Sequence, residues 1–336
     1  MQISTFEPAP ATPSQSSGRT GGLAALINPL SFRMSLRDRA ERSAASIRAH
    51  GGEVFEVNGL DSIQQALHEA LQRPIGRLVL AGGDGTLQAT ATWLARHRDQ
   101  YPLPELIVLA AGRTNYVAAD LGTRKNFLAT LERILETGVD GLHPVDRATL
   151  ALKHPSIGTE HGFFMAGAIV DQVIRDVHRW QEEHPGWRRR HHAASAFGVA
   201  RIALRRLFGV HRFESPRLEI EAAGLGRIGG PCRFLLATTL LLGRSLVDPY
   251  ARRGEGALRL TAVRRDARAL YRHLPRLVSG RFSAAMNPKV GYLSGNCSRI
   301  RIHGIGAITL DGQEFDLDVR TPLTIETGQV FRFLRP

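Results

Sequence analysis

The sequence is poor in cysteine and has no long apolar run. Its two cysteines, Cys232 and Cys297, could form at most one disulfide, and both stand in apolar or strand-like contexts where a buried free thiol is the commoner finding. The most apolar later run, residues 234–242, is shorter than the roughly 20 residues that a membrane-spanning helix needs. Residues 1–22 lack the basic start and the apolar core of a signal peptide, and we expect a disordered tail there. These absences favour a cytoplasmic protein whose contact with a membrane can only be peripheral.

Acidic residues are also in the minority. The 336 residues include 44 Lys and Arg against 31 Asp and Glu, which gives a formal net charge of +13. This excess indicates an anionic partner, which could be nucleotide phosphate, nucleic acid or an acidic membrane surface. No nucleic-acid-binding motif accompanies the charge, so nucleic acid is the weakest of the three. The length accommodates two domains of ordinary size, and a hydrophobic content of 43% is typical of a soluble globular protein.

A glycine cluster at residues 82–85 is the feature around which the chain is organised. Residues 78–81 form a short apolar run typical of a buried strand, and residues 86–95 have the composition of a helix. Glycines at a strand-to-helix junction allow a tight turn and bring N–H groups and the helix dipole close to an anion, which makes a phosphate cradle. Asp84 stands within it, and a carboxylate there needs a metal ion, a proton or a hydroxyl donor beside it. The alternative is an ordinary turn that binds nothing.

Strands and helices alternate through the first half of the chain. We predict strands at residues 23–27, 53–57, 78–81 and 106–110, with helices around 36–47, 61–71, 86–95 and 126–136 and a helix cap at Asp61. This order indicates βαβ units and a mainly parallel sheet, whose ligands bind beyond the carboxyl ends of the strands. Three loops should therefore lie together: Asn28 with Pro29, residues 82–86, and residues 111–115.

Beyond residue 138 the pattern changes to short strands. They are expected at residues 146–152, 163–170, 217–222, 232–242, 257–263, 298–303, 307–310, 314–319 and 323–326, with helices only at 172–183, 193–207 and 267–277. This half should be a largely antiparallel sandwich or a distorted barrel. Asp311-Gly312 lies between apolar pairs and is a two-residue hairpin signal, most often a purely structural turn.

The order and spacing of these motifs resemble the diacylglycerol kinase catalytic domain family of bacterial lipid kinases, which is related to sphingosine kinases and more distantly to NAD kinases. The resemblance rests on Asn28-Pro29, on the Gly82-Gly83-Asp84-Gly85-Thr86 loop, on a glycine-and-asparagine loop one βα unit later, and on Asp311-Gly312. It spans nearly the whole chain from about Leu23.

The resemblance implies an α/β domain with a mainly parallel sheet and a β-rich sandwich domain. After a disordered tail at residues 1–21, the nucleotide-binding kinase domain would cover residues 22–143. A β-rich lipid-binding domain would cover residues 144–322, and residues 323–336 would return to the first domain.

The same resemblance implies roles for individual residues. The residues expected to bind ATP are Asn28, Gly82, Gly83, Asp84, Gly85, Thr86, Gly112, Arg113, Thr114 and Asn115. Asp84 would hold Mg2+, Asp311 would take the proton from a lipid hydroxyl, and Glu255 would bind a structural metal. Phosphoryl transfer needs positioned phosphates, neutralised charge and an oriented hydroxyl, in agreement with these roles.

Several residues depart from the usual pattern of this family. Phe32 stands where a glycine is usual, while Arg113 and Tyr116 replace a hydroxyl and a carboxylate of the nucleotide loop. Arg113 could offer a bidentate phosphate contact or block the pocket. The usual Asp-Gly-Glu turn ends here in Gln313, with Glu314 one place late and so expected on the opposite face of its strand. Nucleotide binding is thus a firmer prediction than turnover.

Residues 175–212 are rich in basic and aromatic side chains, including Trp180 and Trp187. Trp beside Arg suits an anionic membrane surface, and the alternative is the solvated basic face of a packed helix. Histidines also occur there, but without a supporting Cys or carboxylate cluster we interpret them as surface residues rather than metal ligands.

The sequence therefore predicts ATP-dependent phosphorylation of a diacylglycerol-like or sphingoid-like lipid hydroxyl, by an enzyme peripheral to the inner membrane face. ATP and Mg2+ are the predicted cofactors, and a homodimer is one candidate for the oligomeric state. One alternative is an NAD kinase, which also uses a GGDGT loop but whose expected Asn-Glu pair is not evident. Another is a catalytically impaired regulatory protein that binds nucleotide or lipid, which Arg113, Tyr116 and Gln313 support.

Overall fold

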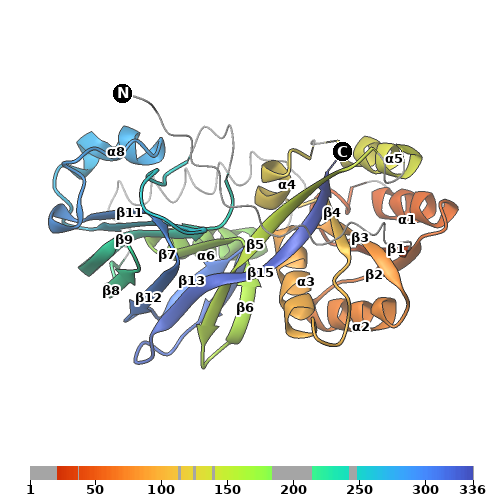
Figure 1. The fold of residues 1–336 in the computed structure, drawn as a ribbon, viewed down its shortest axis with the longest axis horizontal. Coiled ribbons are helices and arrows are strands. Elements are labelled where there is room, and N and C mark those ends of the chain that lie inside the picture. Colours follow the sequence, from red (N-terminus) through yellow and green to blue (C-terminus); the bar gives the residue numbers. More distant parts are fainter. Residues whose placement is uncertain are drawn as a thin grey trace.

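The computed structural model of the protein describes residues 21–36, 38–112, 115–123, 126–137, 141–183, 214–241 and 248–335. It has an α/β part and a β-rich part, with two long strands running between them (Figure 1). Within the described residues, fifteen strands connect into one mixed sheet. The fold class predicted from the sequence is confirmed. None of the helices in these ranges is both long and apolar enough to cross a bilayer.

The α/β part alternates strands and helices as predicted. Its elements are β1 (Gly22–Ile27), α1 (Arg39–Ala49), β2 (Glu53–Glu56), α2 (Leu60–Leu71), β3 (Ile75–Gly82), α3 (Asp84–Arg96), β4 (Glu105–Ala110), α4 (Tyr116–Asp120) and α5 (Phe127–Thr137). The strands pair in the order β2, β1, β3, β4, all parallel, with Ile27 opposite Ala81 and Gly82 opposite Ala110. The carboxyl ends of β1, β3 and β4 therefore reach the same edge of the sheet.

Helix α2 shows how the sequence pattern sets the packing. Its buried apolar side chains recur at helical spacing and face the core: Ile63, Ala66, Leu67, Ala70 and Leu71. The predicted cap at Asp61 is wrong, because the helix begins at Leu60 and the N-cap is Gly59. The hydroxyl of Ser62 accepts a hydrogen bond from the N–H of Gly59, and Asp61 lies in the first turn, where a negative charge favours the helix dipole.

The β-rich part is largely antiparallel. Its elements are β5 (His143–His154), β6 (Gly158–Gly162), β7 (Phe164–Ala168), α6 (Ile169–Glu183), β8 (Arg217–Ala222), β9 (Gly226–Thr238), β10 (Leu258–Arg264), α8 (Leu270–Val278), the 3-10 helix η2 (Pro288–Val290), β11 (Tyr292–Cys297), β12 (Arg299–His303), β13 (Ala307–Leu310), β14 (Gln313–Asp316) and β15 (Leu323–Arg335). The helix predicted at 193–207 lies outside the described residues.

Two strands of this part were missed by the sequence analysis. β6 reads GTEHG and β11 reads YLSGNC, and glycine, asparagine and small polar residues are depleted in strands. Each strand is fixed instead by its neighbours, since β6 pairs with β5 and β11 pairs with β10 along its whole length. Tertiary pairing overrides weak local preference at both places.

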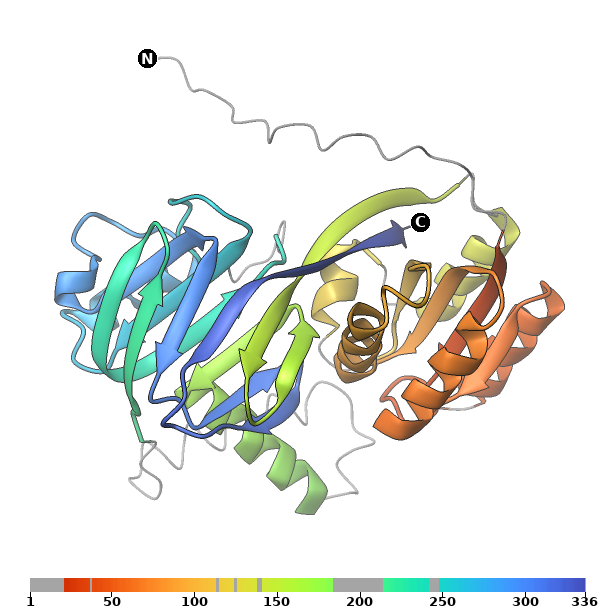
Figure 2. The same cartoon turned by 60° about the horizontal axis from the view of Figure 1, so that its bottom comes forward.

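The strands β5 and β15 form a long ribbon that joins the two parts (Figure 2). They pair antiparallel from Thr324 opposite Lys153 to Arg335 opposite His143. β15 also pairs with β12 of the β-rich part and, through Phe333 opposite Leu106, with β4 of the α/β part. The C-terminal strand therefore belongs to the hydrogen-bonded ladders of both parts.

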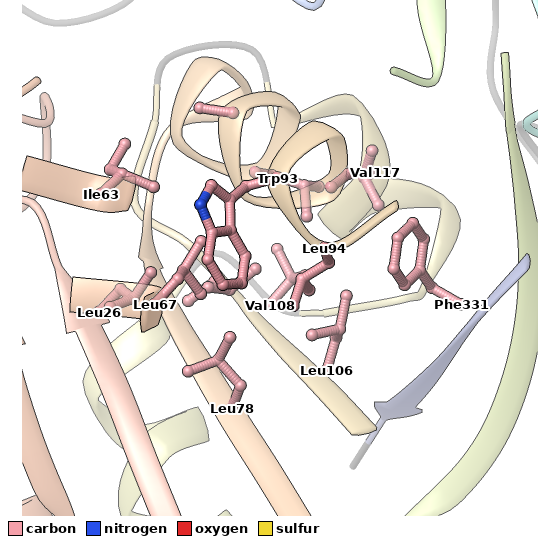
Figure 3. Close-up of a cluster of buried hydrophobic side chains, with 14 of the residues drawn as sticks. Leu26, Ile63, Leu67, Leu78, Trp93, Leu94, Leu106, Val108, Val117 and Phe331 are labelled. Carbon is pink, nitrogen blue, oxygen red and sulfur yellow. The ribbon is translucent and has the colours of Figure 1, made fainter. Parts of the chain in front are cut away.

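One core cluster of the α/β part lies between α2, α3 and the parallel strands (Figure 3), and another packs α1 and α5 against the alternate side chains of the same strands. Trp93 and Leu94 of α3 lie over Leu78 and Leu106, and Phe331 of β15 closes the same cluster. Burying one such side chain contributes about 1.5–3 kcal/mol. This packing fixes the direction of α3 and hence the position of the loop at its start.

The opposite side of α3 contacts the β-rich part through polar groups. The side chain of Gln88 donates to Glu160 Oε2 over 2.9 Å, and the hydroxyl of Thr92 donates to the same oxygen over 3.1 Å. Arg96 forms an ion pair with Glu160 at 2.7 Å. The helix that follows the glycine loop is thus held by both parts of the molecule.

Candidate functional site

The loops that follow β1 and β3 contact one another directly. Asn28 Nδ2 donates a hydrogen bond to Thr86 Oγ1 over 3.2 Å, and Asn28 Oδ1 accepts one from the N–H of Leu30. A Cβ at Gly82 would lie only 2.6 Å from Thr86, so the glycine permits this close packing. The side chain of Asn28 therefore shapes the glycine loop through Thr86.

The loop that follows β4 packs against the same glycines. A Cβ at Gly112 would lie 2.7 Å from the Cα of Gly83, which shows how closely the two backbones approach. Asn115 adopts a left-handed conformation, accepts from the N–H of Gly112 and donates to its carbonyl, both over 2.7 Å. Its amide thus holds the loop closed. Arg113 and Thr114, also predicted to bind nucleotide, lie outside the described residues.

The start of α3 provides backbone donors at this meeting point. Gly83 is the N-cap and offers no side chain to the helix, while Asp84 is the first helical residue. The N–H groups in the first turn of a helix lack intrahelical partners, and the dipole adds positive potential there. This arrangement suits an anion such as a phosphate.

The Asp311-Gly312 turn brings a second carboxyl group to this edge. It joins β13 to β14, and both residues adopt the left-handed conformation that such a turn requires. Asp311 Oδ2 accepts from the N–H of Phe163 over 2.7 Å, and Oδ1 accepts from the N–H of Phe164 over 2.9 Å. Only 5% of Asp311 is exposed. The carboxyl group is therefore fixed in one orientation.

The surroundings of Asp311 change its acidity. Burial raises its pKa well above the ordinary value for aspartate, and the nearby carboxylate of Asp84 raises it further, against two hydrogen bonds that lower it. A bound cation would reduce the repulsion between two carboxyl groups that lie this close together. The pair therefore fits a divalent cation held at Asp84.

The third residue of the turn lies over the glycine loop. A Cβ at Gly85 would lie 3.5 Å from the side-chain nitrogen of Gln313, so the glutamine covers this glycine. Glu314 points the other way, toward α6, with Oε1 2.8 Å from His178 Nδ1 and Oε2 3.6 Å from the Arg175 guanidinium. Glu314 therefore lies on the opposite side, as its offset predicts.

Sequence reasoning missed an aromatic wall beside the two carboxyl groups. The ring of Tyr116 stacks on that of Phe164 at 5.0 Å. Burial, and then the nearby Asp84 carboxylate, raises the pKa of Tyr116. Tyr116 was noted only as a departure from a family pattern, and no local signal marked Phe164. Together they place apolar surface next to the polar centre.

Two buried hydroxyl groups adjoin this wall. Tyr250 is completely buried, and burial raises its pKa, with Tyr116 near enough to add to the effect. Its hydroxyl and that of Thr239 make no hydrogen bond among the described residues. The Arg259 guanidinium lies over the Tyr250 ring and pairs with Asp248 at 2.6 Å. Such groups show no pattern in the sequence, because segments far apart in the chain contribute them.

Glu255 lies apart from this centre. It is exposed in the loop before β10, where the flanking glycines Gly254 and Gly256 contact Asn296 of β11. In the ranges that the structure describes, no group of three or more His, Cys, Asp and Glu side chains could hold a metal ion. The metal site at Glu255 stays a prediction. Most of the basic segment, residues 184–213, lies outside the described residues.

Comparison with known proteins identifies relatives of this arrangement. Residues 22–146 match the family described as "Diacylglycerol kinase catalytic domain". A diacylglycerol kinase from Bacillus anthracis str. Sterne superposes with a TM-score of 0.60 at 12% identity, over 94% of this chain and 97% of the other. An NAD kinase from Archaeoglobus fulgidus in complex with ATP gives 0.44 at 14% identity, over 92% of each chain, a likeness too slight to support an argument. No curated protein sequence matches the chain. The resemblance recognised in the sequence is confirmed for residues 22–146, which match the diacylglycerol kinase catalytic domain family, and the superposition extends the similarity in fold over nearly the whole chain.

Proposed function

We propose that the protein is an ATP-dependent lipid kinase that transfers the γ-phosphate to a lipid hydroxyl. Its N-terminal part, residues 22–146, matches a kinase family. The observation that carries the proposal is the position of Asp311: an oriented, buried carboxyl group beside Asp84 and the glycine loop. Phosphoryl transfer needs a phosphate site and a group that orients the attacking hydroxyl, and these two features would supply them.

In this proposal each part of the site has one task. The N–H groups at the start of α3 bind the phosphates of ATP, and the Gly112 loop, closed by Asn115, packs beside them. Asp311 accepts the proton of the acceptor hydroxyl while its oxygen bonds to the γ-phosphorus and the bond to the β-phosphate oxygen breaks, releasing ADP. Asp84 would hold Mg2+, which neutralises phosphate charge when bound. The raised pKa of Asp311 makes it a stronger base than an exposed aspartate.

The acceptor is proposed to be a lipid because of the surface beside Asp311. The stacked rings of Tyr116 and Phe164 offer apolar contact to an acyl chain. Diacylglycerol-like and sphingoid-like lipids both combine an apolar chain with a primary hydroxyl.

Transfer of labelled γ-phosphate from Mg·ATP into a total lipid extract tests the proposal. The unmodified protein should label a lipid, and Asp84→Asn and Asp311→Asn should abolish the label. Asp99→Asn is the matched control, since this carboxylate is 90% exposed in the same part of the molecule. Absence of label from the unmodified protein would overturn the proposal.

A catalytically impaired nucleotide-binding protein is the second candidate. Tyr116 and Gln313 favour it, because an aromatic ring and a neutral amide stand near Asp84 and Gly85 where the family usually has carboxylates. This candidate predicts that ATP binds to the unmodified protein and that no acceptor is labelled, with NAD included among the acceptors offered.

A further inference from the structure

Helix α8 has an outer face that is unusual for a short surface helix. Its inner face is buried through Leu270 and Leu277. The outer face is exposed and mixes apolar with cationic side chains: Tyr271, Arg272, Leu274, Pro275 and Arg276. Tyr271 is 79% exposed and Leu274 is 41% exposed. An outward helix face is ordinarily polar, so large exposed apolar side chains between cations indicate a contact surface.

The charge around α8 has one sign. Residues 264–291 contain seven Lys and Arg and a single acidic residue. That residue, Asp266, accepts a hydrogen bond from Arg264 over 2.7 Å and leaves the other cations uncompensated within the segment. A one-signed field of this kind attracts anionic partners.

A hollow beside the helix gathers three of these cations. It has a volume of about 500 Å³ and is lined by Arg268, Arg272, His273, Arg276, Asn287 and Val290, among others. Every charged side chain among its described lining residues is basic. Guanidinium groups bind phosphate oxygens bidentately, so the hollow suits a phosphate-bearing headgroup.

The helix is connected to the candidate site through a short segment. The N–H of Asp248 donates to the carbonyl of Val278 at the end of α8. A Cβ at Gly280 would lie 2.6 Å from the carbonyl oxygen of Tyr250, and Tyr250 adjoins Tyr116 of the aromatic wall. α8 lies at the end of the molecule away from the α/β part (Figure 1). The contact of Gly280 with Tyr250 therefore connects α8 to the candidate site through the β-rich part.

We propose that Arg268, Tyr271, Arg272, Leu274 and Arg276, here named the α8 surface, dock the protein on the anionic headgroups of a lipid bilayer. The arginines bind lipid phosphates, while Tyr271 and Leu274 enter the headgroup layer. The proposal rests on the proposed function, because a bilayer-resident acceptor makes such docking useful. Charge complementarity and the exposed apolar pair favour a bilayer over a purely polar polyanion.

Vesicle sedimentation tests the α8 surface. Unmodified protein should sediment with vesicles of phosphatidylcholine and phosphatidylglycerol, and not with phosphatidylcholine alone. Arg272→Gln with Arg276→Gln should weaken binding roughly 30-fold, since each cation near an anionic bilayer contributes about fivefold. Arg42→Gln with Arg48→Gln, two exposed arginines of α1, is the matched control and should bind as the unmodified protein does. Tyr271→Ser with Leu274→Ser should make binding more sensitive to salt.

Equal binding by the unmodified protein and the Arg272→Gln, Arg276→Gln double variant, here called the α8 pair, would overturn the proposal. Failure of the unmodified protein to bind anionic vesicles would also overturn it. Binding to heparin without binding to vesicles would also overturn it and indicate a polyanion instead. A kinase assay separates this result from the proposed function. The α8 pair should phosphorylate a short-chain acceptor in solution at the unmodified rate and a vesicle-embedded acceptor more slowly. If the double variant loses vesicle binding while the unmodified protein binds vesicles but phosphorylates no lipid, the docking proposal is supported and the kinase proposal is refuted.

Discussion

Asp84 and Asp311 carry the same side chain in opposite surroundings. Asp84 is half-buried and is the first residue of α3, directly after the Gly83 N-cap. Asp311 is buried, held by two backbone N–H groups, and has a pKa raised well above that of an ordinary aspartate, first by burial and then by Asp84. The comparison shows that the surroundings of a carboxyl group decide its chemistry. The more accessible Asp84 is suited to binding a cation, and the buried Asp311 is suited to accepting a proton.

Replacing each carboxylate by an amide should separate the two tasks most strongly. Asp311→Asn should lower kcat by about 10²- to 10⁴-fold with the KM for ATP unchanged, because a general base acts in the transition state. Asparagine tolerates the left-handed backbone found at this position, so the turn should persist. Asp84→Asn should raise the Mg2+ concentration needed for half-maximal rate. Steady-state kinetics over a Mg2+ titration measure both effects. If the Mg2+ concentration for half-maximal rate rose equally in the two variants, the separate roles of Asp84 and Asp311 would be contradicted.

A pH series sharpens the comparison, because burial acts on a base in the opposite direction. Burial, followed by Arg96, Arg98 and Lys153, lowers the pKa of His161 to about 4. The unfolded chain takes up a proton near pH 6.5 whereas the folded chain stays neutral. The contribution of His161 to the free energy of unfolding is therefore fully present above about pH 6.5. It falls by about 3 kcal/mol as the pH drops toward 4.

Urea unfolding across this pH range checks the expectation, with His161→Gln as the comparison. Glutamine can still hydrogen-bond to Thr149 Oγ1, which lies 2.9 Å from His161 Nδ1, but it does not titrate. The free energy of unfolding should decline less steeply in this variant than in the unmodified protein. Parallel declines would show that His161 does not contribute.

Two glycines near Asp84 should respond differently to the same added methyl group. In Gly112→Ala the new Cβ would lie 2.7 Å from the Cα of Gly83, a backbone atom that has little room to move, so we expect a loss of about 1–3 kcal/mol in stability. In Gly83→Ala the Cβ would lie 3.5 Å from the Cα of Gly112, an ordinary contact. That variant should keep its stability and, if the proposed function is right, lose affinity for ATP, because the added methyl group would stand at the N-cap of α3, where the proposed phosphate site lies. Thermal unfolding and nucleotide titration distinguish them, and equal loss of Tm in both would contradict the geometry.

Gln313→Glu should have the smallest effect. The new carboxylate would lie over Gly85 and bring a third negative charge near Asp84 and Asp311. We expect the acid limb of the pH-rate profile to move upward and the Mg2+ requirement to fall about two- to fivefold, the size of one partly exposed charge interaction. Glu314→Gln is the control, since that side chain faces α6. An equal shift in the control would mean that the effect is not local.

The glycine loop could be predicted because its signal is local. Residues 82–86 are consecutive, and the alternation of apolar runs with helical patterns predicted three of the loops that meet there. The direction of Glu314 followed from the two-residue period of a strand. These features depend on neighbours in the sequence.

The rest of the candidate site depends on neighbours in space. Asp311 read as a turn residue, and its carboxyl group is oriented by backbone N–H groups of Phe163 and Phe164, which carry no side-chain signal. Gly162 makes room for it, because a Cβ there would lie 2.6 Å from Asp311 Oδ2. Tyr250 likewise reaches the site only through the packing of the β-rich part. Long-range pairing decides such positions, and one sequence alone does not reveal it.

The β5 and β15 ribbon limits how the two parts of the molecule can move. A rotation that separated them would break backbone hydrogen bonds along the ribbon, each contributing about 1 kcal/mol. The register shifts between Thr327 and Val330, and such bulges are where strands bend and twist most. Gly328, within this bulge, packs closely against Thr149 and His161. Any relative motion of the two parts should therefore be a torsion centred on this bulge, because that is where the ribbon loses its regular pairing.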